Sequence, residues 1–232
     1  MSASFLNPHT TVGEMDIYLI NEGRHEALWN ALGAHVIRDE KGNVIGTSFA
    51  VWAPNAKAVS LIHDQNYWDK NTNPMARVGS SGIWETFLPD IQAGLKYKYA
   101  VCGADGRWVD HADPLARQTE VPPLTASIVY ESDYSWKDRA WMDQRAKFEA
   151  WRSPVSVYEV HLGSWRLGLT YKELAKELIE YVKSHGFTHV EFLPVTEHPY
   201  SPSWGYQVTG FFAPTARFGT PDDFKFLVDA LH

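Results

Sequence analysis

The sequence has very little cysteine and no long apolar run. Its 232 residues include a single cysteine, Cys102, so an intrachain disulfide is impossible and a small buried strand residue is expected there. No apolar run approaches the ~20 residues that a membrane span needs. The first fourteen residues also lack the charged start and apolar block of a signal peptide. These absences predict a protein of the reducing cytoplasm with no membrane partner.

Basic residues are outnumbered, and metal-binding patterns are missing. Lys and Arg total 21 against 28 for Asp and Glu, a net charge of −7, and no long basic run is present. Nucleic acid is therefore an unlikely class of partner. Histidines lack the tight spacing of metal ligands, so we expect no metal and no cofactor. The histidines considered are His161, His185, His189 and His198.

Aromatic residues are abundant instead. They make up 14% of the chain, and ten of them are tryptophans. One interpretation is a tryptophan-rich core, and the other is contact with carbohydrate, because flat apolar rings with a polar handle suit stacking on a sugar.

The first half of the sequence has an all-β pattern after a short lead segment. In residues 1–46 we expect one helix from about Arg24 to Leu32, ended by Gly33. Between residues 47 and 131, short apolar stretches separated by turn signals predict a β-sandwich. The expected strands cover residues 48–52, 58–62, 83–88, 97–101 and 126–130. Residues 132–153 form a charged connector that carries three tryptophans.

The pattern changes to α/β over residues 154–232. A strand at 155–160 with both faces covered precedes a helix that a capping box of Thr170 and Glu173 opens and Gly186 ends. A strand at 188–193 follows, and Thr220 and Pro221 open a last helix. This order signals a parallel sheet. Only two βα units are present, against the eight of a closed barrel, so we expect the front part of a longer enzyme or a truncated product.

Five aromatic residues gather between Trp204 and Phe218 without a strand or helix period. We therefore expect a loop there, after the carboxyl end of a strand and before a helix. In an α/β barrel this is the catalytic face. The alternative is a loop that tucks its aromatic side chains beneath itself.

Several motifs resemble glycogen branching enzymes, a family of the alpha-amylase superfamily, and together they cover nearly the whole chain. The sandwich motif, Phe49–Ala56, is similar to the starch- and glycogen-binding module of the family. The motifs of the second half are Tyr158–Trp165, Gly186–Glu191, Leu193–Pro199, Ser203–Gly210, Ala213–Thr215 and Gly219–Pro221. The resemblance implies a multidomain β plus α/β protein, in which a β-sandwich carbohydrate-binding module precedes the first two βα units of a (β/α)8 barrel.

The resemblance also implies an activity and a partner. Branching enzymes cut an α-1,4-glucan such as glycogen and rejoin the cut segment through an α-1,6 bond. Tyr206 matches the tyrosine that packs against the sugar at the cleavage site, with Trp204 and Gln207 shaping the same loop. The three catalytic carboxylates belong to later strands, so no catalytic residue is assigned here and the chain alone is expected to be inactive. Glu159, Glu191 and Glu197 are interpreted as structural residues or as residues that support the site from behind, not as catalytic ones.

In the sandwich, Trp68, Lys98 and Trp108 match the two tryptophans and lysine of related glycogen-binding modules in an energy-sensing kinase. The loop His63–Trp68 departs from the usual Gly-Asp-Phe-Asn-x-Trp pattern of the family. A module that only packs on the barrel is therefore an equal alternative. For the whole chain, the alternatives are a non-catalytic glucan-binding fragment and another enzyme of the superfamily, either a debranching or a trehalose-releasing hydrolase.

Overall fold

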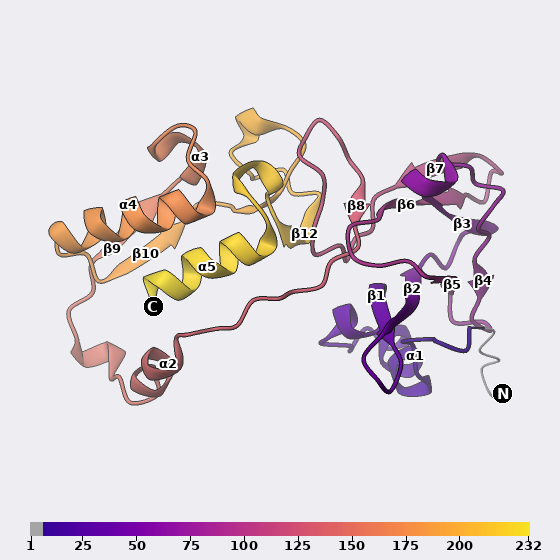
Figure 1. The fold of residues 1–232 in the computed structure, drawn as a ribbon, viewed down its shortest axis with the longest axis horizontal. Helices are drawn as coiled ribbons and strands as arrows, with labels where there is room; N and C mark the ends of the chain where they lie inside the picture. Colours follow the sequence, from indigo (N-terminus) through magenta and orange to yellow (C-terminus); the bar gives the residue numbers. More distant parts are fainter. Residues whose placement is uncertain (1–6) are drawn as a thin grey trace. The chain divides into compact units, whose positions relative to one another are not determined.

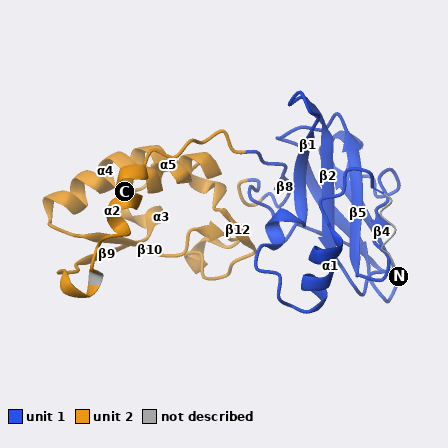
Figure 2. Cartoon of the chain, turned by 90° about the horizontal axis from the view of Figure 1, so that it is seen from below, with its two compact units in different colours: residues 1–120, 124–131 blue, residues 121–123, 132–232 orange. Residues whose placement is uncertain are grey.

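A computed structural model describes residues 7–232. The chain forms two compact units, which Figure 2 shows in different colours. Within the described residues, the first unit contains residues 7–120 and 124–131, and the second contains residues 121–123 and 132–232. No helix in the described part of the chain is long and apolar enough to cross a membrane.

The first unit is built from two antiparallel sheets (Figure 1). One sheet has the order β1 (Gly33–Arg38), β2 (Val44–Trp52), β5 (Ile83–Pro89) and β4 (Ala76–Arg77). The other has the order β3 (Ala58–His63), β6 (Lys96–Cys102) and β7 (Trp108–His111), and β8 (Ser127–Ile128) also pairs with β6. The predicted strands are found here, with changed ends.

Apolar side chains of both sheets meet in one core. Phe49 of β2 lies edge-on to Tyr97 of β6, with ring centroids 5.0 Å apart. Leu61 of β3 and Trp84 of β5 are buried in the same cluster. Because the core joins two sheets face to face, it accounts for the β-sandwich that the alternating sequence pattern predicts. Cys102 is buried, as expected.

The amino-terminal segment differs from the prediction. The helix is α1 (Glu14–Asn21), and the predicted helix from Arg24 to Leu32 is wrong, since only the single turn η1 (Leu28–Asn30) is helical there. The Asp16 carboxylate accepts the backbone N–H of Gly13 and so opens the helix early. Gly23, at φ +65°, then turns the chain away. The first sheet also begins at Gly33, inside the segment expected to precede the sandwich.

The second unit contains the predicted strand, helix and strand order. Strands β9 (Val157–Val160) and β10 (His189–Phe192) pair in parallel, and α4 (Tyr171–Ser184) connects them. Helices α4 and α5 (Pro221–Leu231) pack together over the strands (Figure 1). The Thr170 hydroxyl accepts the Glu173 N–H, and the Thr220 hydroxyl accepts the Asp223 N–H, so both helices begin at their predicted caps.

Only one face of this parallel pair is covered. Val160 is buried against the helices, whereas Val157 and Glu159 of β9 and Glu191 of β10 are exposed. The expectation that β9 has both faces covered is therefore wrong for this structure. An apolar sequence run specifies what a strand can bury but not how many layers are present to bury it.

The connector has more structure than the sequence suggests. Ser132 and Tyr134 donate hydrogen bonds to Asp222 and Asp229 of α5, which hold an extended strap along that helix. The strap leads into α2 (Arg139–Arg145), and η3 (Ala150–Arg152) follows. In α2, the Trp141 ring stacks on His232 at a centroid distance of 3.7 Å.

Candidate functional site

The candidate site begins where β9 and β10 end. The strands are parallel, so their carboxyl ends lie at the same edge of the pair. His161 follows β9 directly and precedes the short helix α3 (Leu162–Trp165). Pro194 follows β10, and the chain then runs through residues 195–220 to α5.

The expected loop contains regular structure. Strand β12 (Gly210–Pro214) pairs antiparallel with β11 (Thr196–Glu197), so the prediction of a loop throughout is wrong. The register of this pair shifts between Thr196 and Glu197. An irregular pair with glycine and proline at its ends does not give the clean alternation that identifies a strand from sequence. This pairing brings the two ends of the segment between β11 and β12 together.

A strained turn lies inside this segment. The 3₁₀ turn η4 (Ser201–Ser203) ends at Trp204, whose φ of +54° is left-handed. Gly205 follows at φ +86°, and a Cβ built on it would lie 2.7 Å from the Pro194 carbonyl oxygen. Only glycine allows that approach of the two backbones. The backbone N–H of Tyr206 donates to the Ser203 carbonyl at 3.0 Å and closes the turn.

Trp204 contacts His161, the residue that follows β9. Its ring stacks on the His161 imidazole with centroids 4.6 Å apart and planes 12° apart. The His161 Nδ1 atom lies 2.8 Å from the Ser164 hydroxyl. Burial lowers the pKa of His161, and the nearby His198 lowers it further. Both effects favour the neutral imidazole.

Tyr206 presents its ring to solvent and is 67% exposed. Gln207 and Trp204 are also exposed. The structure thus brings the three predicted residues to one turn. Other exposed aromatic side chains of the same segment are Tyr200, Phe211 and Phe212. Exposed aromatic rings of this kind are typical of a surface that stacks against a sugar polymer and are not typical of side chains that form a core.

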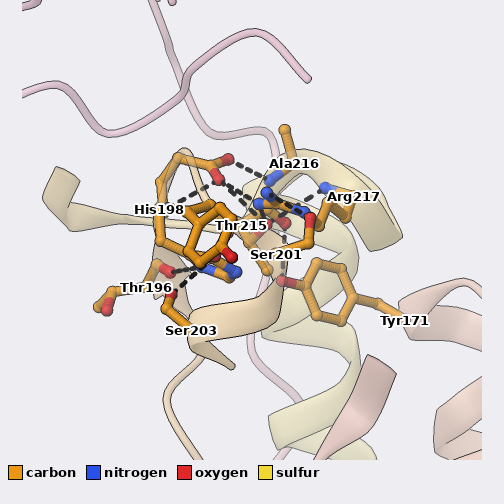
Figure 3. Close-up of polar contacts among 10 residues, drawn as sticks. Tyr171, Thr196, His198, Ser201, Ser203, Thr215, Ala216 and Arg217 are labelled. Carbon is orange, nitrogen blue, oxygen red and sulfur yellow. Dashed lines mark hydrogen bonds and ion pairs between the residues drawn. The ribbon is translucent and has the colours of Figure 1, made fainter. Parts of the chain in front are cut away.

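A buried ion pair between Arg217 and Glu197 stabilises the segment between β10 and α5 (Figure 3). Glu197 accepts hydrogen bonds from Arg217 Nη1 at 2.8 Å and from the Ala216 backbone N–H at 2.7 Å. The Nη2 atom of Arg217 donates to the Ser201 hydroxyl at 3.1 Å. The sequence analysis missed Arg217, because nothing in the sequence pairs it with a glutamate 20 residues away.

The three glutamates have different surroundings, and no catalytic pair is formed. Glu159 and Glu191 face each other in the parallel register and are exposed. Glu197 is buried and bound to Arg217. A glycosidase pair requires one protonated and one ionised carboxyl group across a sugar. In the described part of the chain, no group of three or more His, Cys, Asp or Glu side chains is placed to hold a metal ion.

The sandwich residues form a second candidate surface. The Lys98 ammonium lies 5.7 Å from the Trp68 ring centroid, and Lys70 lies 5.5 Å from that of Trp108. Trp108 pairs with Cys102, four residues along β6 from Lys98. Side chains four residues apart in a strand share a face, so Lys98 and Trp108 emerge on the same face of the sheet. Both indoles are more than a third exposed.

Residues 31–116 match the family of carbohydrate-binding module 48, the isoamylase N-terminal domain. Among the relatives, the 1,4-alpha-glucan branching enzyme GlgB of Nocardia farcinica is 61% identical over 96% of this chain and 30% of its own length. GlgB 1 of Streptomyces coelicolor is 58% identical over 96% of this chain and 28% of its own length.

A solved structure is also similar. A provisionally named alpha amylase of Salmonella typhimurium has a TM-score of 0.68 and 28% identity, over 87% of this chain and 31% of that protein. The chain thus spans about a third or less of each of these three proteins. Over nearly its whole length, the chain is therefore similar in sequence to 1,4-alpha-glucan branching enzymes.

Proposed function

We propose that this chain is the amino-terminal part of an enzyme that cuts an α-1,4-glucan and rejoins the segment through an α-1,6 bond. The observation that carries the proposal is the exposed Tyr206 on a hydrogen-bonded turn after β10, in a chain 61% identical to a branching enzyme. In the proposed enzyme, β9, α4, β10 and α5 are the first two βα units of a (β/α)8 barrel. The sandwich begins at Gly33, residues 132–153 connect it to the barrel, and the barrel begins at residue 154.

The proposed chemistry divides between this chain and later strands. Tyr206 stacks on the sugar at the bond that breaks, and the hydrogen-bonded turn reduces the conformational freedom that the protein must lose when the sugar binds. The reaction itself uses a carboxylate nucleophile and an acid/base ~5–5.5 Å apart, supplied by later barrel strands. The reducing cytoplasm, where a single cysteine stays reduced, is the proposed location.

We expect the 232-residue chain alone to be inactive, since Glu159 and Glu191 are exposed and Glu197 is bound to Arg217. The longer enzyme, expressed from the complete gene, is expected to lower the iodine stain of amylose and to form α-1,6 linkages detectable by proton NMR. Loss of stain with release of short linear sugars or trehalose would instead identify a hydrolase. Activity of the purified 232-residue chain would overturn the proposal that later strands supply the catalytic carboxylates.

A second candidate function is non-catalytic binding of glucan by the sandwich. It is favoured by two exposed tryptophans with lysines over their rings, Trp108 in β7 and Trp68 in the turn region after β3. Flat indoles stack on glucose rings, and the Lys98 ammonium can donate to sugar hydroxyls. The Lys98 ammonium already donates to the Thr125 hydroxyl at 2.8 Å, which fixes its position beside Trp68.

Calorimetric titration of the 232-residue chain with maltoheptaose tests this second function. Losing one stacking contact of ~1 kcal/mol weakens binding roughly fivefold, so Trp68→Ala and Trp108→Ala should each have at least that effect. Trp151→Ala is the control, because Trp151 is an exposed tryptophan of the second unit. Equal affinity of all four proteins would mean that the sandwich does not bind glucan through these residues.

A further inference from the structure

The proposed function assigns no role to His161, although it is the residue on which Trp204 rests. The two rings are nearly parallel, 12° apart, with centroids at 4.6 Å. His161 comes from the end of β9, and Trp204 comes from the segment after β10. The stack therefore joins the carboxyl end of β9 to the segment after β10, at the point where the exposed turn begins.

The turn needs such a support. Trp204 is left-handed at φ +54°, a conformation that a bulky residue adopts rarely and holds only when its surroundings fix it. On one side, Gly205 lies against the backbone of Pro194. On the other side, the indole lies on the imidazole. Tyr206 is the next residue, so any change in the backbone at Trp204 and Gly205 moves it directly.

His161 is itself firmly held. Its backbone carbonyl accepts the N–H groups of Ser164 and Trp165, and its ring nitrogen Nδ1 lies 2.8 Å from the Ser164 hydroxyl. The residue at 163 is a glycine, and a Cβ built there would lie 3.2 Å from the His161 ring and 3.3 Å from the Phe218 ring. The small residue thus leaves room for the imidazole where it is.

We propose that His161 is a positioning residue of the glucan site: its ring supports Trp204, fixes the turn through Gly205 and so sets Tyr206 against the sugar. This inference rests on the proposed function. It adds a residue that touches no sugar in the proposed complex and acts through the indole. The flat face of the His161 ring is the property that matters. Phenylalanine is therefore the conservative replacement for His161, and alanine is the disruptive one.

The first experiment uses the 232-residue chain and the indole N–H resonance of Trp204, assigned by its loss in Trp204→Phe. We expect His161→Ala to shift and broaden this resonance, because the indole loses its stacked partner. His161→Phe should keep a single sharp resonance. The control is His185→Ala, which removes another histidine beside an aromatic ring, 4.3 Å from Tyr181, at the end of α4. An unchanged Trp204 resonance in His161→Ala would overturn the supporting contact.

The second experiment measures turnover on amylose, at saturating glucan, in the longer enzyme from the complete gene. Because the indole loses its stacked partner, kcat of His161→Ala should fall roughly fivefold or more. The melting temperature of this variant should stay close to that of the wild type. His161→Phe should restore most of the turnover, and His185→Ala should match the wild type.

The outcomes separate this inference from the proposed function. A wild-type enzyme without branching activity would overturn the proposed function and this role with it. An active wild type that loses turnover in Tyr206→Ala but not in His161→Ala would overturn this role alone. A His161→Ala enzyme that loses turnover only in proportion to its lowered melting temperature would show that the histidine is merely structural.

Discussion

The guanidinium of Arg217 meets the carboxylate of Glu197 at 2.8 Å, with the two side chains only 17% and 6% exposed. The pair joins the start and the end of the segment that carries Tyr206. Removing water from both charges is costly, so neither can lose its partner without a large penalty. The buried ion pair therefore fixes the two ends of the segment that carries the exposed turn.

Arg217→Ala should destabilise the chain by about 3–5 kcal/mol, because it leaves the Glu197 carboxylate buried without its counter-charge. Chemical denaturation followed by far-ultraviolet circular dichroism measures the change. Arg166→Ala is the matched control, since Arg166 pairs with Glu177 at the surface. An exposed pair contributes ~0–1 kcal/mol. Equal costs for the two variants would contradict a special contribution of the buried pair.

Gly205→Ala should be more harmful than Gly168→Ala. Both glycines have similar backbone conformations, at φ +86° and +82°. A Cβ at Gly205 would lie 2.7 Å from the Pro194 carbonyl oxygen, whereas a Cβ at Gly168 would meet nothing within 4 Å. Left-handed strain alone costs about 1–2 kcal/mol, and only the Gly205 variant adds a backbone clash. Thermal unfolding of the two variants compares them, and similar melting temperatures would show that the turn adjusts.

Glu85 should make the stability of the sandwich depend on pH. Its side chain is buried, its Oε1 atom has no hydrogen-bond partner among the described residues, and Thr10 donates to Oε2 at 2.5 Å. Burial raises the pKa of this carboxyl above its usual value, and the Thr10 hydrogen bond offsets part of the rise. The fold therefore favours the protonated acid, and its contribution is lost as pH rises from the unfolded pKa through the raised folded pKa.

Glu85→Gln should remove this component, so its melting temperature should fall less than that of the wild type between pH 4 and pH 8. Glu26→Gln, at an exposed position, should follow the wild-type profile. Identical pH profiles for all three proteins would mean that Glu85 is ionised in the fold as readily as in the unfolded chain.

Local signals predicted much of the fold. The caps at Thr170 and Thr220 and the strands of the sandwich follow from side chains that act within a few residues of themselves. The helix Glu14–Asn21 was missed because its start depends on one hydrogen bond from Gly13 to Asp16, and its apolar residues resemble a short strand. Its partly buried residues Ile17 and Ile20 pack against a buried cluster that includes Ala50 and Ile83 of the sheet, and only the folded unit shows this packing.

The candidate site was predicted in part for a similar reason. Trp204, Tyr206 and Gln207 are adjacent in sequence, so a motif is enough to group them. His161 lies 43 positions before Trp204 and Glu197 lies 20 before Arg217, and such pairs are created by the fold alone. Sequence patterns also do not show that Trp204 is left-handed, because that conformation is rare for a tryptophan and is imposed by its surroundings.

The sharpest test of the site is a substitution of Tyr206 in the proposed longer enzyme. The side chain is exposed and makes no contribution to the buried clusters, so Tyr206→Ala should leave the melting temperature nearly unchanged. If its ring stacks on the sugar more tightly in the transition state, losing ~1 kcal/mol or more should lower turnover at saturating glucan roughly fivefold or more. Tyr206→Phe keeps the ring face and should be much milder. The readouts are iodine-stain kinetics on amylose and a parallel thermal scan. Unchanged turnover of Tyr206→Ala with a lowered melting temperature would make Tyr206 a packing residue and would remove the turn as the sugar site.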